Sequence, residues 1–306
     1  MEKRFYSNGK LLITGEYAVL DGALSLAVPT KYGQSLTVKE IDQPQILWKS
    51  LDKNGAIWFE EIFELNNLKP ITTLKDLDKK TIKETLVCIL MEAKKMNPEF
   101  LKSKTGFEIH TQLNFPRDWG LGSSSTLINN IAQWAKVDAY QLLWNSFSGS
   151  GYDIACAQHN SPILYQLKKE LPEVKEISFS PNFKNQLFFI HLNKKQNSRD
   201  AITNYRKQNF DEKTLLLKVT QITKKMIAAS TLSKFESLMF QHEKILSNIL
   251  KVKPVKERLF NDYFGAIKSL GAWGGDFILV TGNKKTPEYF ISKGFNTIIS
   301  YSDMVL

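Results

Sequence analysis

Apolar positions along this chain follow two different periods. Between residues 107 and 113 they alternate with polar ones, which predicts a half-buried strand. Between residues 81 and 96 they recur every three or four positions, which predicts an amphipathic helix. Shorter apolar runs predict further strands at residues 11–14, 17–20, 35–38, 186–192, 277–281 and 297–301.

Helical spacing also marks several later segments. We expect helices over residues 124–135, 213–229, 232–250 and 256–270 and a short one near residue 288, the first of them capped by a serine. The balance shifts from strand-rich to helix-rich near residue 165. This order predicts an α+β fold in two halves, with domains at residues 1–165 and 166–306 and a cleft between them.

Basic residues outnumber acidic ones by 41 to 31, so the formal net charge is +10. This charge suits an anionic ligand such as a nucleotide, and it would also suit nucleic acid. Because the lysines are spread along the chain and form no dense tract, we expect no nucleic-acid partner.

Nothing in the sequence predicts a membrane segment or a secreted protein. The longest apolar run, residues 86–91, is far short of a membrane span, and no apolar run follows the charged N-terminus. The two cysteines, Cys88 and Cys156, are far apart and fit no disulfide or zinc pattern. We therefore expect a cytoplasmic protein without a membrane partner.

A glycine-serine loop lies between a predicted strand and a predicted helix. Its residues are Gly120, Leu121, Gly122, Ser123, Ser124 and Ser125. Glycines let the backbone approach a ligand closely, and the amides at a helix start point toward an anion that the helix dipole favours. A serine hydroxyl could also bind Mg²⁺, which prefers oxygen. The alternative is a serine-rich helix cap that binds no ligand.

Three better-known loops do not fit this sequence. A dinucleotide-binding GxGxxG would need a glycine at Ser125, and a nucleophile elbow would need one at Thr126. A P-loop would need Ser or Thr after Gly9 and Lys10, where Leu11 stands.

Four segments, in the family's order, resemble the motifs of the GHMP kinase superfamily, which includes galactokinase, homoserine kinase, mevalonate kinase and phosphomevalonate kinase. Residues 116–124 resemble its ATP-binding motif, and residues 8–20 resemble the N-terminal motif of the mevalonate and phosphomevalonate branch. Residues 148–155 resemble the segment with the catalytic aspartate, and residues 271–276 the C-terminal glycine-rich motif. The string Gly-Tyr-Asp-Ile-Ala at residues 151–155 also resembles a GYDIA-type subgroup.

The resemblance implies a two-lobed fold, with a ribosomal-protein-like N-terminal domain and a ferredoxin-like C-terminal domain. It implies ATP and Mg²⁺ as cofactors, with ATP on the glycine-serine loop and Pro116 before it. It also implies the remaining site residues: Asp153 as base, Lys10 as cation, Ser124 as magnesium ligand, and Glu16, Tyr17, Gly274 and Gly275 near the substrate.

Each charged candidate also has an ordinary structural reading. Asp153 precedes a short apolar stretch and could cap a helix or turn. Lys10 could be a surface lysine at the start of a strand, and Glu16 could belong to a turn after Gly15. The resemblance favours the catalytic roles.

The sequence departs from the family at several positions. Asn8 replaces the usual proline, and Trp273 replaces a glycine of the third loop. The magnesium-binding glutamate of mevalonate kinases has no counterpart, because residues 141–143 read Gln-Leu-Leu. The way in which this chain would hold Mg²⁺ is therefore open.

The sequence predicts a kinase that transfers the γ-phosphoryl group of ATP to a mevalonate-like or phosphomevalonate-like acceptor. Within the same family, an ATP-dependent diphosphomevalonate decarboxylase is the alternative. From other classes, a basic nucleic-acid-binding protein and a non-catalytic ligand-binding homologue stay open. The expected partner is a small hydroxy acid or its phosphate, and a homodimer is the candidate assembly.

Overall fold

The computed structural model describes every residue except 1, 66–67, 69–80, 103–104, 195–197 and 274. The contacts divide the chain into two compact units. Unit 1 comprises residues 1–9, 32–117 and 122–158, and unit 2 comprises residues 10–31, 118–121 and 159–306. These units are discontinuous, whereas the predicted domains are separated at one position, near residue 165; that domain assignment stays a prediction.

In unit 1, strands pair in the order β4-β3-β5-β2. The strands are β2 (Ser25–Ile41), β3 (Gln45–Leu51), β4 (Ile57–Glu64) and β5 (Gly106–Leu113), and β1 (Glu2–Thr14) pairs with β2. The helices are α1 (Ile82–Met96), α2 (Ser123–Ala135), α3 (Ala139–Ser146) and α4 (Tyr152–Gln158). The inner sides of this sheet and of α1, α2 and α3 share one hydrophobic core around Trp48, Ile109 and Ile131.

In unit 2, a four-stranded antiparallel sheet has the order β11-β8-β10-β9. Its strands are β8 (Leu187–His191), β9 (Ile267–Ser269), β10 (Phe277–Thr281) and β11 (Ile298–Ser300). The first residues of β2, from Ser25 to Ala27, pair with β6 (Ile163–Lys168), which pairs with β7 (Leu171–Glu176). The long strand β2 therefore has paired residues in both units, because its later residues, 34–41, pair with β5.

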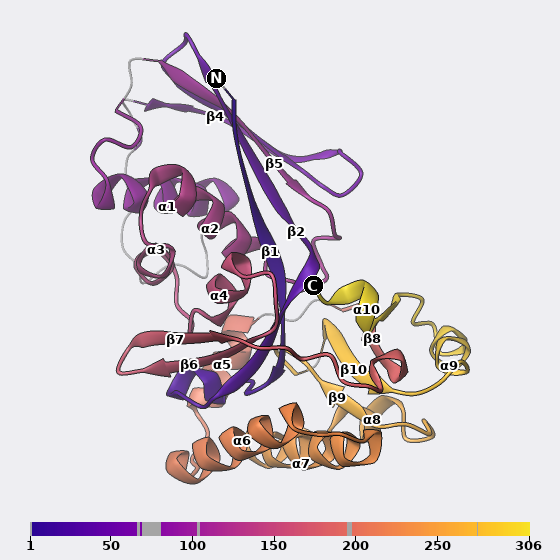
Figure 1. Ribbon diagram of the computed structural model, residues 1–306. Coiled ribbons are helices and arrows are strands. Elements are labelled where there is room, and N and C mark those ends of the chain that lie inside the picture. Colours follow the sequence, from indigo (N-terminus) through magenta and orange to yellow (C-terminus); the bar gives the residue numbers. More distant parts are fainter. Residues whose placement is uncertain (1, 66–67, 69–80, 103–104, 195–197, 274) are drawn as a thin grey trace. The chain divides into compact units, whose positions relative to one another are not determined.

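The helices of unit 2 differ greatly in length. The longest, α6 (Glu212–Ile227) and α7 (Leu232–Leu250), lie side by side (Figure 1). The shorter ones are η1 (Ala18–Asp21), η4 (Lys184–Gln186), α5 (Ser198–Arg206), α8 (Val255–Leu259), α9 (Thr286–Ser292) and α10 (Tyr301–Met304).

Local sequence explains where several helices begin. Thr81 and Glu84 form a capping box at the start of α1, and Thr231 caps α7. Such caps satisfy amides that a helix leaves without an internal partner. The predictions for α1, α7, β5 and β10 are confirmed, with bounds that agree to within a residue.

Two predicted elements are wrong. Residues 17–20 form no strand: Tyr17 has a positive φ of 62°, and residues 18–20 belong to η1. The predicted helix at 256–270 ends at Leu259, and residues 267–269 form β9 instead. A side chain at Gly265 would lie 2.0 Å from the Thr281 carbonyl oxygen, so the backbone approach to β10 overrides the helical spacing.

Several elements have no counterpart in the sequence prediction. They are β3, β4, β6, β7, α3, α4, α5 and α10. Among the described residues, no helix combines the length and the apolar character that a membrane crossing requires.

Candidate functional site

The glycine-serine loop ends in an exposed helix start. Gly120 and Gly122 have positive φ angles of 67° and 90°, which favour glycine over other residues. Gly122 is the N-cap of α2, and the first helical bond runs from the Thr126 amide to the Gly122 carbonyl at 3.0 Å. No described side chain caps this helix, so the predicted serine cap is wrong. The serines instead form its first turn, where the amides have no partner within the helix.

The three serines of this turn have different surroundings. The Ser125 hydroxyl is buried and donates to the Gly122 carbonyl at 2.9 Å, so it stabilises the turn itself. Ser124 is exposed and Ser123 is half-buried. Of the three, Ser124 therefore presents the most accessible hydroxyl for a ligand or a metal ion.

A neutral network of buried polar side chains holds α2 in unit 1. Asn130 accepts from the Ser7 hydroxyl at 2.8 Å and donates to the Gln34 carbonyl at 2.9 Å. Asn129 donates to Ser7 at 2.9 Å, and the Thr126 hydroxyl donates to the Gln34 side chain at 2.8 Å. These bonds join α2 to β1 and β2 with groups that carry no charge.

In unit 2, Lys10 contacts the first half of the loop. Its ammonium donates to the Gly120 carbonyl at 2.9 Å, and its backbone amide donates to the Leu121 carbonyl at 3.0 Å. A side chain at Gly120 would lie 2.4 Å from the carboxyl carbon of Asp276. Lys10, Gly120 and Asp276 therefore lie together, although they come from three distant parts of the sequence.

Asp153 lies in unit 1, in the first turn of α4. Glycines with positive φ precede it, at Gly149 and Gly151, and its Oδ1 accepts from the Ile154 amide at 3.2 Å. The carboxylate is half-buried. Burial and then neighbouring charges, Asp153 among them, raise the pKa of the Tyr140 hydroxyl. Because Lys10 belongs to unit 2, its proximity to Asp153 stays a prediction.

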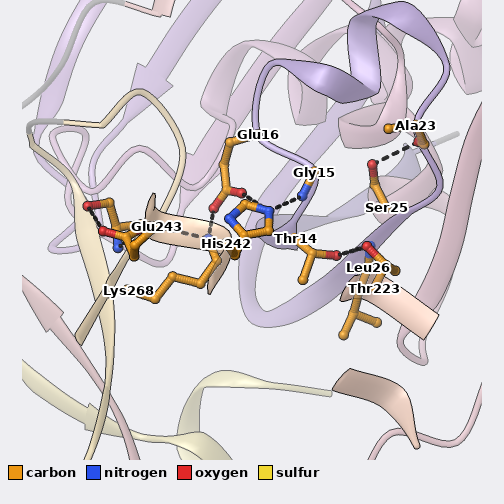
Figure 2. Close-up of polar contacts among 11 residues, drawn as sticks. Thr14, Gly15, Glu16, Ala23, Ser25, Leu26, Thr223, His242, Glu243 and Lys268 are labelled. Carbon is orange, nitrogen blue, oxygen red and sulfur yellow. Dashed lines mark hydrogen bonds and ion pairs between the residues drawn. The ribbon is translucent and has the colours of Figure 1, made fainter. Parts of the chain in front are cut away.

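Glu16 and Tyr17 are both buried in unit 2. The Glu16 carboxylate forms an ion pair with Lys268 and lies 3.4 Å from His242 Nε2 (Figure 2). Tyr17 stacks on Tyr205 with ring centroids 5.2 Å apart, and burial raises the pKa of its hydroxyl. Both side chains thus have protein partners, and their contact with a substrate stays a prediction.

The third glycine-rich segment lies beside η1. Gly274 lies outside the described residues, while Gly275 is buried. Trp273, which stands where the family has a glycine, has a positive φ of 53° and is only 5% exposed. The Trp273 ring belongs to the same hydrophobic cluster as Tyr17. Trp273 thus keeps a positive φ, which a glycine adopts more easily, and its side chain adds hydrophobic packing.

One cavity of about 790 Å³ lies in unit 2, between α7 and the segment from α8 to β9. Its lining includes Phe240, Glu243, Lys256 and Phe264. No described residue that the sequence predicts for the site lines this cavity. Among the described residues, no group of three or more His, Cys, Asp or Glu side chains could hold a metal ion.

Comparison with known proteins relates these observations to a family of folds. A scan against protein-family models finds no match, and a search of the curated proteins finds none either. Solved structures do match. The Methanococcus jannaschii mevalonate kinase has a TM-score of 0.72 at 16% identity, over 98% of this chain and 97% of that chain. The chain has the GHMP kinase fold.

Other GHMP kinase structures match similarly. A second mevalonate kinase has a TM-score of 0.71 at 16% identity, over 97% of this chain and 98% of that one. The Streptococcus pneumoniae phosphomevalonate kinase in complex with phosphomevalonate and AMPPNP has a TM-score of 0.69 at 14% identity, over 97% and 99%. The predicted α+β class is therefore confirmed, while the GYDIA-type subgroup is not resolved.

Sequence patterns did not identify the buried polar residues that hold the proposed site in place on this GHMP kinase fold. Asn129 and Asn130 look like ordinary helix residues, and no pattern signals their network. Lys268 lies three residues before the glycine-rich segment, inside a predicted helix, where a lysine is usually exposed, so no pattern signals its burial.

Proposed function

We propose that this chain is an ATP-dependent small-molecule kinase whose acceptor is a mevalonate-like or phosphomevalonate-like compound. The observation that carries the proposal is the uncapped start of α2, which follows two glycines with left-handed backbones. Amides at such a helix start bind phosphate oxygens, and the helix dipole favours their charge. The GHMP kinase fold supports the same reading, because the Streptococcus pneumoniae phosphomevalonate kinase, which matches this fold, is in complex with phosphomevalonate and AMPPNP.

The ATP triphosphate would bind to the first turn of α2, with Pro116 in the turn before the loop. Any side chain at Gly120 would occupy space that Asp276 already fills, so the loop keeps its shape only with glycine. The Lys10 ammonium and the Lys10 backbone amide donate to the Gly120 and Leu121 carbonyls, so these two oxygens face Lys10. The amides between residues 122 and 125 are then presented to the phosphates.

Phosphoryl transfer depends mainly on positioning and on neutralisation of charge. Asp153 would accept the proton of the acceptor hydroxyl as that oxygen attacks the γ-phosphorus. Lys10 would stabilise the charge of the transferring group, and Gly274, Gly275, Glu16 and Tyr17 would shape the acceptor pocket.

Mg²⁺ usually keeps several waters and binds through one or two protein oxygens and the substrate phosphates. The exposed Ser124 hydroxyl at the start of α2 fits this pattern without a cage of carboxylates. Bound there, the ion would neutralise phosphate charge.

A panel of acceptors tests the proposal directly. ADP release would be measured with Mg-ATP and mevalonate, phosphomevalonate, diphosphomevalonate or a sugar, and carbon dioxide would be measured in parallel. We expect ADP without carbon dioxide. Carbon dioxide with diphosphomevalonate would favour the decarboxylase, and no ADP with any acceptor together with no nucleotide binding would contradict the proposal.

Asp153→Asn tests the role of the base. We expect turnover to fall about 10²- to 10⁴-fold, the usual contribution of general acid-base catalysis, with nucleotide binding little changed. Asp138→Asn is the matched control, because Asp138 caps α3 with its Oδ1 and Asn caps helices equally well. Unchanged turnover in Asp153→Asn would favour a ligand-binding homologue without catalysis.

A further inference from the structure

Four ionisable side chains are buried together in unit 2. Glu16 follows β1, His242 and Glu243 belong to α7, and Lys268 belongs to β9; none is more than 2% exposed. Figure 2 shows their side chains pointing toward one another. Charged side chains are rarely buried this fully unless they are paired, so the cluster needs an explanation.

The contacts join three elements. The Lys268 ammonium donates to the Glu16 carboxylate and, at 2.9 Å, to the Ser269 carbonyl. The Glu243 carboxyl accepts from the Ser269 amide and hydroxyl, both at 3.0 Å. The Gly15 amide donates to His242 Nε2 at 3.1 Å. The turn after β1 is therefore bonded to α7 and β9.

Burial shifts the pKa values of three side chains in this cluster. Burial lowers the pKa of His242 well below its ordinary range, so its imidazole is neutral and accepts the Gly15 amide proton. Burial raises the pKa of Glu243 to about 8, so this carboxyl is mostly protonated at neutral pH. Burial also raises the pKa of Glu16, and the neighbouring Lys268 ammonium opposes this shift, so the charge of Glu16 depends on its contact with Lys268.

A buried ion pair is weak evidence for stability, because hydrophobic residues often do as well, and its best-attested use is to specify one arrangement. The strand β9, which this ion pair holds, is followed directly in the chain by the glycine-rich segment of the proposed site. β9 ends at Ser269, and the glycine-rich segment that follows packs Trp273 into the cluster of Tyr17 and reaches Gly120 through Asp276.

We propose that Lys268 is a positioning residue, which through its buried ion pair with Glu16 holds the turn after β1 against β9 and so sets the backbone of residues 271–273. Its functional consequence rests on the proposed kinase activity. In this proposal, Glu16 lies in the interior of unit 2 and affects the backbone of residues 271–273 through its ion pair with Lys268.

Lys268→Met keeps the length of the side chain and removes its charge, and Lys268→Arg keeps the charge. Lys256→Met is the control, because Lys256 is half-buried in unit 2 and its ammonium donates to the Gly265 carbonyl at 2.6 Å rather than to a carboxylate. Glu16→Gln, alone and with Lys268→Met, covers the case in which the single lysine variant does not fold.

Hydrogen exchange of the amides at residues 271–273 is the first readout, compared with the amides of β10 in the same protein. For Lys268→Met or Glu16→Gln we expect exchange at 271–273 to rise at least tenfold more than in β10, and near wild-type exchange for Lys268→Arg and Lys256→Met. An equal rise in both segments would show only a loss of global stability and would overturn the proposal.

The second readout is kinetic. We expect the KM for ATP or the acceptor to rise at least tenfold in the folded Lys268→Met protein, with a smaller change in kcat. The Lys268→Arg protein should have a KM close to that of the wild type. Wild-type KM values in folded Lys268→Met would contradict the positioning role. If the wild type shows no turnover, the proposed kinase activity fails, and hydrogen exchange still decides the role of Lys268.

Discussion

Two buried polar networks stabilise different parts of this chain. In unit 1, amides and hydroxyls of Ser7, Asn129 and Asn130 hold α2. In unit 2, the ion pair of Glu16 and Lys268 holds the turn after β1. A neutral network keeps its bonds at any moderate pH, whereas a charged cluster couples the backbone to protonation. The two halves of the proposed site should therefore respond differently to substitution and to pH.

The largest effect is expected for Lys268→Met. It leaves the Glu16 carboxylate buried without its counter-charge, which typically lowers the free energy of unfolding by about 3–5 kcal/mol. Urea denaturation at pH 7 measures this loss. The double variant Glu16→Gln/Lys268→Met should recover part of it, because both charges are then absent, and a purely additive loss would show that the pair is not coupled.

A smaller loss is expected for Asn130→Ala in the neutral network. The Ser7 hydroxyl loses its acceptor and the buried Gln34 carbonyl loses its donor, which costs about 1–3 kcal/mol. Denaturation between pH 6 and 8 should show the same loss at every pH. A loss that changes with pH would mean that an ionisable group takes part in this network.

The third expected effect is a change in how steeply the free energy of unfolding varies with pH. Burial raises the pKa of Glu243 from 4.5 to about 8, so the folded protein holds this proton more tightly than the unfolded chain does. Its contribution to stability is complete below pH 4.5 and is lost as the pH rises toward 8. Burial lowers the pKa of His242 from 6.5, so its contribution is lost in the opposite direction, as the pH falls below 6.5.

Between pH 6.5 and 8 the Glu243 loss operates and the His242 loss does not, and the Glu243 loss amounts to about 1–2 kcal/mol. Glu243→Gln resembles the protonated carboxyl: its oxygen can still accept from the Ser269 amide, while its NH2 group would donate to the Ser269 hydroxyl oxygen, so we expect this part of the slope to disappear. Denaturation at half-unit steps of pH measures it, with Asn130→Ala as the comparison. An unchanged slope would show that Glu243 does not titrate in this range.

The smallest effect on stability is expected for Ser124→Ala. Ser124 is exposed, so the free energy of unfolding should change by less than about 0.5 kcal/mol. Ser125→Ala removes a buried bond to the Gly122 carbonyl and should cost about 1 kcal/mol. Titration with Mg-AMPPNP separates the roles: weaker binding in Ser124→Ala alone would support the metal ligand, and equal binding in both would contradict it.

The pattern of apolar residues was enough to predict the amphipathic helix α7 and the strand β10, which is buried along its whole length. The helix α7 and the strand β10 have the predicted bounds, and α2 begins one residue before its predicted start. Motif resemblance led to the fold that the structural comparison shows. The role of each predicted site residue stays a prediction.

The spacing of apolar residues failed to predict the structure where contacts with residues far along the chain decide the backbone conformation. Ile267 continues the helical spacing of Phe260 and Tyr263, yet residues 267–269 form a strand that pairs with β10. Tyr17 lies in an apolar run, but its positive φ is not that of a strand, and its ring stacks on Tyr205.

The sequence by itself determined where glycines permit a tight loop, where helices begin at capping residues, and which fold the motifs resemble, since these depend on neighbours within a few positions. The tertiary structure alone decided that Lys268 meets Glu16, 252 positions away, and that Asp276 fills the space beside Gly120. The reason is physical: a buried charge is tolerated only where folding supplies its partner, and local sequence carries no record of that partner.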